Sequence, residues 1–159
     1  MLIVLEGCDG SGKTTLAKLL ADVSGGRIIH CTKDTPNDFH FFKGLIEIAK
    51  DSPVDIIADR WCYGQFVYQD FDERPLNGED YDCYQALLEI EGLMLKNNAK
   101  VVFVDAPSEV IAKRLAQRDE TLINGLTIDE VRKRFRDIQK NSLLTWIEYN
   151  TGGTDNGTV

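Results

Sequence analysis

The stretch LIVLEGCDGSGKTT, residues 2–15, decides the fold of this chain. Its first residues form a short apolar run that favours a β-strand, and from Lys13 onward leucines recur at helical spacing. Between the two, Gly7 to Thr14 fits the pattern GxxxxGKS/T at every defined position. Because this pattern lies between a strand and a helix, the sequence predicts a phosphate-binding loop rather than a glycine-rich turn that only caps a helix.

The chemistry of such a loop explains its spacing. Glycines allow successive backbone N–H groups to turn toward one anion, and the following helix offers the positive end of its dipole to the same anion. We expect Lys13 to reach the terminal phosphates of ATP and Thr14 to ligate Mg²⁺. The residues predicted to bind the donor nucleotide are Gly7, Asp9, Gly10, Ser11, Gly12, Lys13, Thr14 and Thr15.

Length and composition limit the functions that the chain can have. Its 159 residues suit one domain with a central sheet covered on both sides. Lysine and arginine number 18 against 26 aspartate and glutamate residues, and the net charge of −8 argues against binding a nucleic-acid backbone. The four cysteines form no CxxC pair, which indicates reduced thiols. The first apolar run is too short for a signal peptide or a membrane span, so we expect a cytoplasmic protein with no membrane partner.

Apolar runs predict five strands, at residues 2–5, 27–32, 54–58, 100–104 and 145–150. Helical patterns separate these runs, and strands that alternate with helices favour a mostly parallel sheet. The sequence therefore predicts a three-layer α/β/α architecture around five strands. The expected helix caps are Asn37 or Asp38, Ser108, and Thr127, which forms a capping box with Glu130 and opens a last helix that reaches about Trp146.

The third apolar run delivers Asp59, Arg60 and Trp61 at its carboxyl end. Open α/β sheets bind ligands at that edge, so these residues are well placed to serve a site. Asp59 could hold Mg²⁺ or one of its waters, and Arg60 could bind a phosphate through two parallel hydrogen bonds. The alternative is a salt bridge at the strand end that faces solvent.

Several motifs coincide with one family, and the chain resembles thymidylate kinases, or more broadly the P-loop deoxynucleoside monophosphate kinases. GCDGSGKTT is similar to the family's phosphate loop, and DRWCYGQFVYQ, residues 59–69, is similar to its DRY…AYQ stretch. HCTKDTP, residues 30–36, resembles the Thr-Arg-Glu-Pro segment, with lysine for arginine and aspartate for glutamate. FVDAPSEVIAKRLAQRD, residues 103–119, resembles the fourth strand and the lid helix. The resemblance implies the P-loop NTPase fold with a short lid.

The resemblance also implies substrate-binding roles. Asp9 would lie near the sugar 3′-hydroxyl or a substrate-binding arginine, Arg60 would bind the acceptor monophosphate, and Gln69 would line the nucleoside pocket. Phe39 and Phe42 are surplus aromatics that could stack on a base, with ordinary core packing as the alternative. The residues expected to bind the substrate are Asp9, Lys33, Phe39, Arg60, Tyr68 and Gln69.

Two lid arginines complete the expected site. The phosphate loop has no arginine between Gly7 and Lys13, so the family's pattern moves that charge to a lid at about residues 114–126. The alternative is a solvated basic helix face. A polar tail at about residues 151–159 is expected to be mobile. The residues expected to act in catalysis are Lys13, Arg60, Arg114 and Arg118, with Thr14 and Asp59 holding the metal.

The expected reaction transfers the γ-phosphoryl group of ATP to the 5′-phosphate of a deoxynucleoside monophosphate, dTMP or a related pyrimidine nucleotide. One alternative is a deoxynucleoside kinase, in which Asp34 could take the proton from a 5′-hydroxyl group. Another is a nucleotide-binding regulator with weak catalysis or none. The segment from Phe39 to Asp59 has no match for the helix whose arginine reads the pyrimidine in this family, so the base stays open. Family members commonly form dimers, which also leaves a homodimer open.

Overall fold

The computed structural model describes residues 1–32, 34–36, 38–68, 83–122 and 125–152. The strands are β1 (Leu2–Glu6), β2 (Arg27–His30), β3 (Ile56–Asp59), β4 (Lys100–Asp105) and β5 (Trp146–Asn150). The helices are α1 (Lys13–Ser24), α2 (Phe39–Asp51), α3 (Tyr63–Tyr68), α4 (Cys83–Lys96), α5 (Ser108–Gln117) and α6 (Ile128–Asn141).

The strands form one sheet in the order β2-β3-β1-β4-β5, and every neighbouring pair in the described ranges runs parallel. The central strands are continuous apolar runs, as expected for parallel strands that are buried on both faces. β1 lies between β3 and β4, with Leu5 opposite Asp59. The loop that follows β1 and the residues that follow β3 therefore emerge side by side at the carboxyl edge of the sheet.

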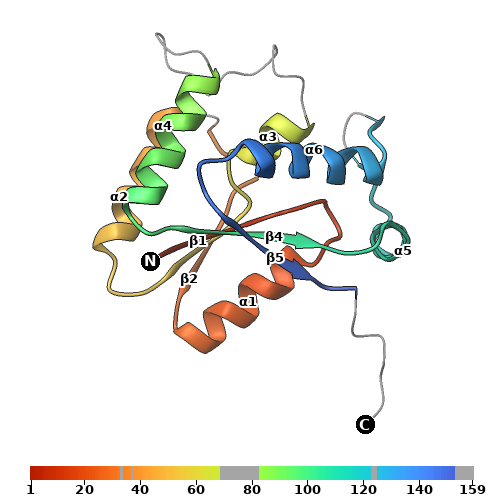
Figure 1. Ribbon diagram of the computed structural model, residues 1–159. Helices are drawn as coiled ribbons and strands as arrows, with labels where there is room; N and C mark the ends of the chain where they lie inside the picture. Colours follow the sequence, from red (N-terminus) through yellow and green to blue (C-terminus); the bar gives the residue numbers. More distant parts are fainter. Residues whose placement is uncertain (33, 37, 69–82, 123–124, 153–159) are drawn as a thin grey trace.

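Helices cover both faces of the sheet, which confirms the predicted three-layer α/β/α architecture. Figure 1 shows α2, α3, α4 and α6 over one face and α1 on the opposite face. α5 lies beyond the carboxyl end of β4, on the side where the loop after β1 also emerges. The elements that the sequence predicts to carry the site are thus gathered at one end of the molecule.

The sheet divides the core into two clusters. The larger one includes Phe42, Tyr63 and Phe135, which are fully buried and come from three of the helices on the α2–α6 face. The smaller one joins β1 to α1 and contains the fully buried Leu5 and Val104. Burying one such side chain stabilises the fold by about 1.5–3 kcal/mol, so β1 is held firmly from both sides. No helix in the described part of the chain is long and apolar enough to cross a bilayer.

The helix caps mostly follow the prediction. Asp38 caps α2 by accepting from the His40 amide, and Thr127 forms the expected capping box with Glu130 at the start of α6. The Ser108 cap is wrong, because Pro107 is the N-cap and Ser108 is already the first residue of α5.

The structure differs from the sequence prediction in two further places, the end of α6 and the position of two phenylalanine rings. α6 ends at Asn141 rather than near Trp146, because the chain leaves the helix at Ser142 and enters β5 at Trp146. Phe39 and Phe42 are 3% and 0% exposed and belong to the core cluster, so their rings pack inside the protein in this conformation. The predicted base-stacking role for Phe39 has no support in this geometry.

Candidate active site

The phosphate-binding loop joins β1 directly to α1. A Cβ atom on Gly7 would lie 2.1 Å from the Val104 carbonyl oxygen, so only glycine allows the loop to pass this close to β4. Gly12 has a φ of 103° and occupies the N-cap of α1, where no side chain accepts a hydrogen bond from the helix amides. The amides of the first turn of α1 are therefore available to an anion.

The interior of the loop suits phosphate groups. Ser11 is fully buried, and within the described residues its hydroxyl oxygen has no hydrogen-bond partner. Lys13 is also buried and donates from Nζ to the Gly7 and Cys8 carbonyl oxygens at 2.7 and 2.8 Å. Burial lowers the pKa of Lys13, although the neighbouring Asp9 carboxylate opposes the shift. An anionic phosphate would offer this ammonium group a partner of full charge and would use the free Ser11 hydroxyl.

The two predicted metal ligands lie in contact. Thr14 donates from its hydroxyl to Asp59 Oδ2 at 2.7 Å, because the β1–β3 register brings the end of β3 beside α1. A hydroxyl and a carboxylate are hard oxygen ligands of the kind that Mg²⁺ accepts, usually with one or two protein ligands and several waters. His30 Nδ1 lies 3.1 Å from the same Asp59 oxygen. His30 was not predicted from the sequence to be a site residue, although its place at the end of β2 could have pointed to it.

Arg60 stands directly against the phosphate-binding loop. Its Nη2 donates to Asp9 Oδ1 at 2.7 Å, and its side chain is 46% exposed. The backbone at Arg60 has a φ of 77°, an uncommon conformation for a side chain with a Cβ. Burial works to lower the pKa of Arg60, but the Asp9 and Asp59 carboxylates outweigh it and raise the pKa. Arg60 thus stays fully charged, with open surface on which a second anion could bind.

The other predicted substrate residues are only partly described. The Tyr68 hydroxyl accepts a hydrogen bond from the Asp9 amide at 3.1 Å, which fixes the end of α3 against the loop. Lys33 and Gln69 lie outside the described residues. The structure therefore brings Asp9, Arg60 and Tyr68 together as one group.

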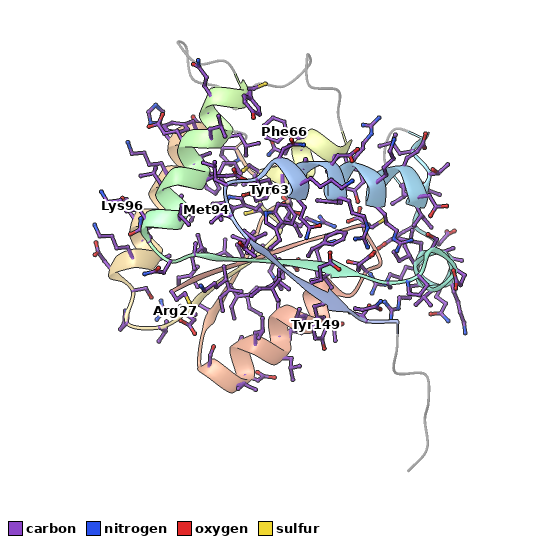
Figure 2. All side chains as sticks on the ribbon, viewed as in Figure 1. Arg27, Tyr63, Phe66, Met94, Lys96 and Tyr149 are labelled. Atoms are coloured by element: carbon purple, nitrogen blue, oxygen red, sulfur yellow. The ribbon has the colours of Figure 1, made fainter. Side chains whose placement is uncertain are left out.

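A pocket of about 360 Å³ lies beside the loop, next to α1. Figure 2 shows Tyr149 on the α1 side of β5, where it contributes to this pocket. The residues that line it include Gly10, Gly12, Thr15, Arg114, Arg118 and Tyr149. Both arginines predicted for the lid therefore face the same space as the phosphate-binding loop.

Arg114 is held in place by the end of β5. It donates from Nη1 to the Thr151 hydroxyl at 2.8 Å and from Nη2 to the Thr151 carbonyl at 3.1 Å. Thr151 in turn donates from its hydroxyl to the Ser11 carbonyl at 2.6 Å and from its amide to the Asp105 carbonyl at 2.8 Å. Thr151, where the sequence predicts the start of a mobile tail, is thus bound to the loop and to β4, and residues 153–159 lie outside the described residues.

Glu6 is a buried acid that was not predicted from the sequence to be a site residue. It is 1% exposed, and its Oε1 accepts from the Trp61 and Gly64 amides at 2.9 and 3.0 Å. Burial raises the pKa of Glu6 to about 7, against the opposing effect of Lys13. A charged residue inside an otherwise apolar strand, directly before the phosphate-binding loop, was the signal that could have revealed it.

Comparisons with known proteins agree with this geometry. No protein-family model matches the sequence. The chain is 29% identical over 162 residues to the SPbeta prophage-derived uncharacterized protein YorR of Bacillus subtilis, covering 95% of this chain and 89% of YorR. It is also 29% identical over 189 residues to a "Probable thymidylate kinase" of Methanococcus aeolicus, covering 99% of this chain and 89% of that protein.

Solved structures share the fold over nearly the whole chain. A crystal structure of YorR in complex with phosphorylated GDP matches with a TM-score of 0.77 and 28% identity, over 98% of this chain and 88% of that one. The deoxyadenosine kinase of M. mycoides with bound dCTP matches with a TM-score of 0.54 and 16% identity, over 96% and 90% of the two chains, which supports the fold alone. In sequence and in structure, the chain is thus similar over nearly its whole length to thymidylate kinase-like P-loop kinases.

Proposed function

We propose that this protein transfers the γ-phosphoryl group of ATP to the 5′-phosphate of a deoxynucleoside monophosphate, dTMP or a related pyrimidine nucleotide. The relative named a probable thymidylate kinase supports a nucleotide kinase in general, and so does the phosphorylated GDP in the YorR structure. The choice of a monophosphate acceptor has one main support, the contact between Arg60 and Asp9. This contact puts an exposed guanidinium group at the rim of the loop that holds the donor, where a second anion would have to bind.

The proposed mechanism relies on alignment and charge. The acceptor phosphate has a second pKa of about 6, so it is largely dianionic at neutral pH and needs no general base. Mg²⁺ would be held by Thr14 and Asp59, and it would neutralise charge on the phosphates of ATP. Lys13 would hold the donor phosphates and Arg60 the acceptor phosphate, which keeps two mutually repelling anions in line.

The lid arginines would add charge on the donor side. Arg114 and Arg118 both line the pocket beside Gly10 and Gly12, so they are close to where the donor nucleotide would lie. We propose that they stabilise the transferring phosphoryl group, and that the segment at about residues 114–126 acts as the lid within a single domain. Closing such a lid would also keep water from accepting the phosphoryl group.

A substrate panel tests this proposal. Purified protein is incubated with labelled ATP, Mg²⁺ and each of the common ribonucleoside and deoxyribonucleoside monophosphates, and the diphosphate products are measured. We expect the highest kcat/KM with dTMP or another pyrimidine deoxynucleotide. If none of the monophosphates is phosphorylated, the proposal is rejected.

The YorR structure gives a reason to include guanine nucleotides in the panel. That protein was crystallised with phosphorylated GDP and shares 28% identity with this chain. GTP is therefore tested as the donor, and GMP and dGMP as acceptors. A clear preference for guanine acceptors would keep the monophosphate kinase reaction but replace the pyrimidine substrate.

The rival function is a deoxynucleoside kinase, whose acceptor is a hydroxyl group. Such an enzyme needs a carboxylate to take the proton, and Asp34 is an exposed carboxylate in the turn after β2. The deoxyadenosine kinase of M. mycoides shows that this fold also carries that activity. Thymidine and dTMP are compared side by side, and turnover of thymidine alone would favour the rival.

The other class is a nucleotide-binding regulator. It would bind ATP through the same loop without transferring the phosphoryl group. The contacts of Lys13, Thr14, Asp59 and Arg60 support an intact kinase site instead. ATP binding without transfer to any acceptor in the panel would favour the regulator.

A further inference from the structure

Glu6 lies between the phosphate-binding loop, which is the proposed donor site, and the segment that carries Arg60, which is the proposed acceptor site. Its side chain is buried and reaches neither ligand. It is the last residue of β1 and directly precedes the phosphate-binding loop. Its side chain is buried against the start of α3, where the chain arrives from the end of β3. A carboxyl group that is 1% exposed needs partners, and in this protein the partners are backbone amides of the segment that carries Arg60.

One oxygen atom of Glu6 accepts both hydrogen bonds. Oε1 receives the Trp61 amide at 2.9 Å and the Gly64 amide at 3.0 Å. The Arg60 amide donates to the Leu5 carbonyl at 3.1 Å, so three amides between Arg60 and Gly64 bind to the end of β1. These bonds fix the bend after β3 in which Arg60 has its left-handed φ of 77°.

The far end of α3 returns to the same loop. Tyr68 accepts from the Asp9 amide at 3.1 Å, and Asp9 accepts from Arg60 at 2.7 Å. The segment 60–68 is therefore attached to β1 and its loop at its start through Glu6 and at its end through Asp9. Contacts at both ends of this segment therefore hold the proposed acceptor site against the proposed donor site.

We infer that Glu6 is a positioning residue, which sets the place of Arg60 and hence the binding of the acceptor phosphate. The inference rests on the proposed function, because it assigns Arg60 to the acceptor. Without the Glu6 carboxyl group, the buried Trp61 amide and the partly buried Gly64 amide would lose their partner, and the bend at Arg60 would relax toward an ordinary backbone conformation. Arg60 would then shift relative to Asp9, whereas Lys13 and the glycines of the loop would keep their own contacts.

The test separates acceptor binding from donor binding. Steady-state kinetics are measured for the wild type, Glu6→Ala and Glu6→Gln with the acceptor that the wild type uses best. We expect Glu6→Ala to raise the acceptor KM by about tenfold to a hundredfold, as misplacement of a positioning group does, and to change the ATP KM by less than about twofold. Glu6→Gln retains an oxygen acceptor at the same distance and should restore the acceptor KM to within about threefold of the wild type.

A matched control distinguishes positioning from a general loss of stability. Glu91 is another buried glutamate, 1% exposed, which accepts from the Leu143 amide and, within the segment 60–68, from the Tyr63 side-chain hydroxyl. Its removal leaves the backbone amides of Trp61 and Gly64 bound to Glu6. Glu91→Ala should lower the melting temperature without a selective rise in the acceptor KM. An unchanged acceptor KM in Glu6→Ala, or an equal rise in Glu91→Ala, would overturn the inference.

A second pair of variants covers the case in which Glu6→Ala does not fold. A Cβ on Gly64 would lie 3.6 Å from Glu6 Oε2, an ordinary contact, so Gly64→Ala should leave the acceptor KM near the wild-type value. Gly64→Pro removes one of the two amides that donate to Glu6, in the first turn of α3 where proline is tolerated best. It should raise the acceptor KM relative to Gly64→Ala, and equal values would contradict the inference. A wild type that phosphorylates no acceptor would instead refute the proposed function.

Discussion

At the scale of single residues, Lys13 shows why the loop can recognise phosphate. Its ammonium group is buried, and among the residues that the structure describes it is bound only to carbonyl oxygens and, at 3.8 Å, to Asp9. Carbonyl groups are weak partners for a full charge, so a phosphate would replace them with a gain in free energy. The fold therefore already holds the cation where the proposed donor would need it.

Removing this cation should stop the reaction. We expect Lys13→Ala to lower kcat by about 10²–10³, because a preorganised charge at the transferring phosphoryl group is lost. Phosphoryl transfer is measured with labelled ATP, and ATP binding by calorimetry. Lys18→Ala changes an exposed lysine on the same helix and should leave both quantities unchanged. A fully active Lys13→Ala protein would refute the role of the loop.

Arg60 should be sensitive even to a conservative change. We expect both Arg60→Ala and Arg60→Lys to raise the acceptor KM, because lysine cannot offer the planar pair of donors that binds a phosphate through two hydrogen bonds. The rise for Arg60→Ala should reach about a hundredfold. Arg27→Ala is the control, since Arg27 lies at the amino end of β2, far from the site (Figure 2). If Arg60→Lys binds the acceptor as well as the wild type does, Arg60 does not bind the acceptor phosphate through two parallel hydrogen bonds.

Glu6 should make the stability of the protein depend on pH. Burial raises its pKa from 4.5 to about 7, while Lys13 and Arg60 act to lower it, and the nearby Cys31 and Cys62 thiols are neutral. A pKa raised on folding means that the protonated acid contributes stability below about pH 4.5, and that this contribution is lost as the pH rises through about 7. The loss is on the order of 3 kcal/mol.

Urea unfolding at pH 5 and pH 8 measures this dependence. The wild type should lose more free energy of unfolding between the two pH values than Glu6→Gln, whose side chain does not titrate. The comparison between the two proteins removes the effects of the other titrating groups. Equal losses in both would show that the Glu6 pKa is not raised.

At the scale of elements, α6 is attached to the sheet by charge as well as by its apolar side. Arg132 binds the Asp105 carboxylate through Nε and Nη2 at 2.8 and 2.9 Å, and Arg136 adds a third hydrogen bond at 2.8 Å. Asp105 is the last residue of β4 and lies beside the phosphate-binding loop. These contacts hold α6 at the carboxyl edge of the sheet, where the site lies.

The capping box at the start of α6 offers an independent test of this element. The Thr127 hydroxyl accepts from the Glu130 amide at 3.2 Å, and the Glu130 carboxylate accepts from the Thr127 amide at 2.7 Å. We expect Thr127→Ala to lower the free energy of unfolding by about 1 kcal/mol, measured by urea unfolding, with kcat unchanged. Thr145→Ala, at an exposed position between α6 and β5, should change it by less than about 0.5 kcal/mol. Equal effects of the two variants would show that the cap contributes no stability.

At the scale of the whole molecule, the site draws on β1, α1, β3, α3 and α5. A ligand that binds all of them should stabilise the entire fold. Saturating ATP with Mg²⁺ at a hundred times its dissociation constant should add about 2.7 kcal/mol to the free energy of unfolding. Thermal unfolding with ATP and with inorganic tripolyphosphate measures how much of this comes from the nucleoside. ATP should give the larger shift, because the pocket of about 360 Å³ beside the loop has room for the nucleoside. Equal shifts would show that only the phosphates bind.

Much of this architecture could be predicted from local sequence. The phosphate-binding loop can be recognised in the sequence because glycines, lysine and threonine must follow one another at fixed spacing to surround an anion. The parallel sheet follows from apolar runs that alternate with helical patterns, and the Thr127 capping box depends on residues only three positions apart. Each of these signals arises from interactions between neighbours in the chain.

The contacts between distant segments were decided by the tertiary structure alone. The sequence placed Asp59 and Arg60 at a strand end, but only the β1–β3 register brought Arg60 to Asp9, which is 51 residues away. Glu6 binds an amide 58 residues away, and Thr151 binds the Ser11 carbonyl across 140 residues. Strand order, register and packing set these distances, and no local pattern encodes them. The sequence by itself therefore determined which loop is proposed to hold the donor phosphates, and the fold determined which residues meet around it.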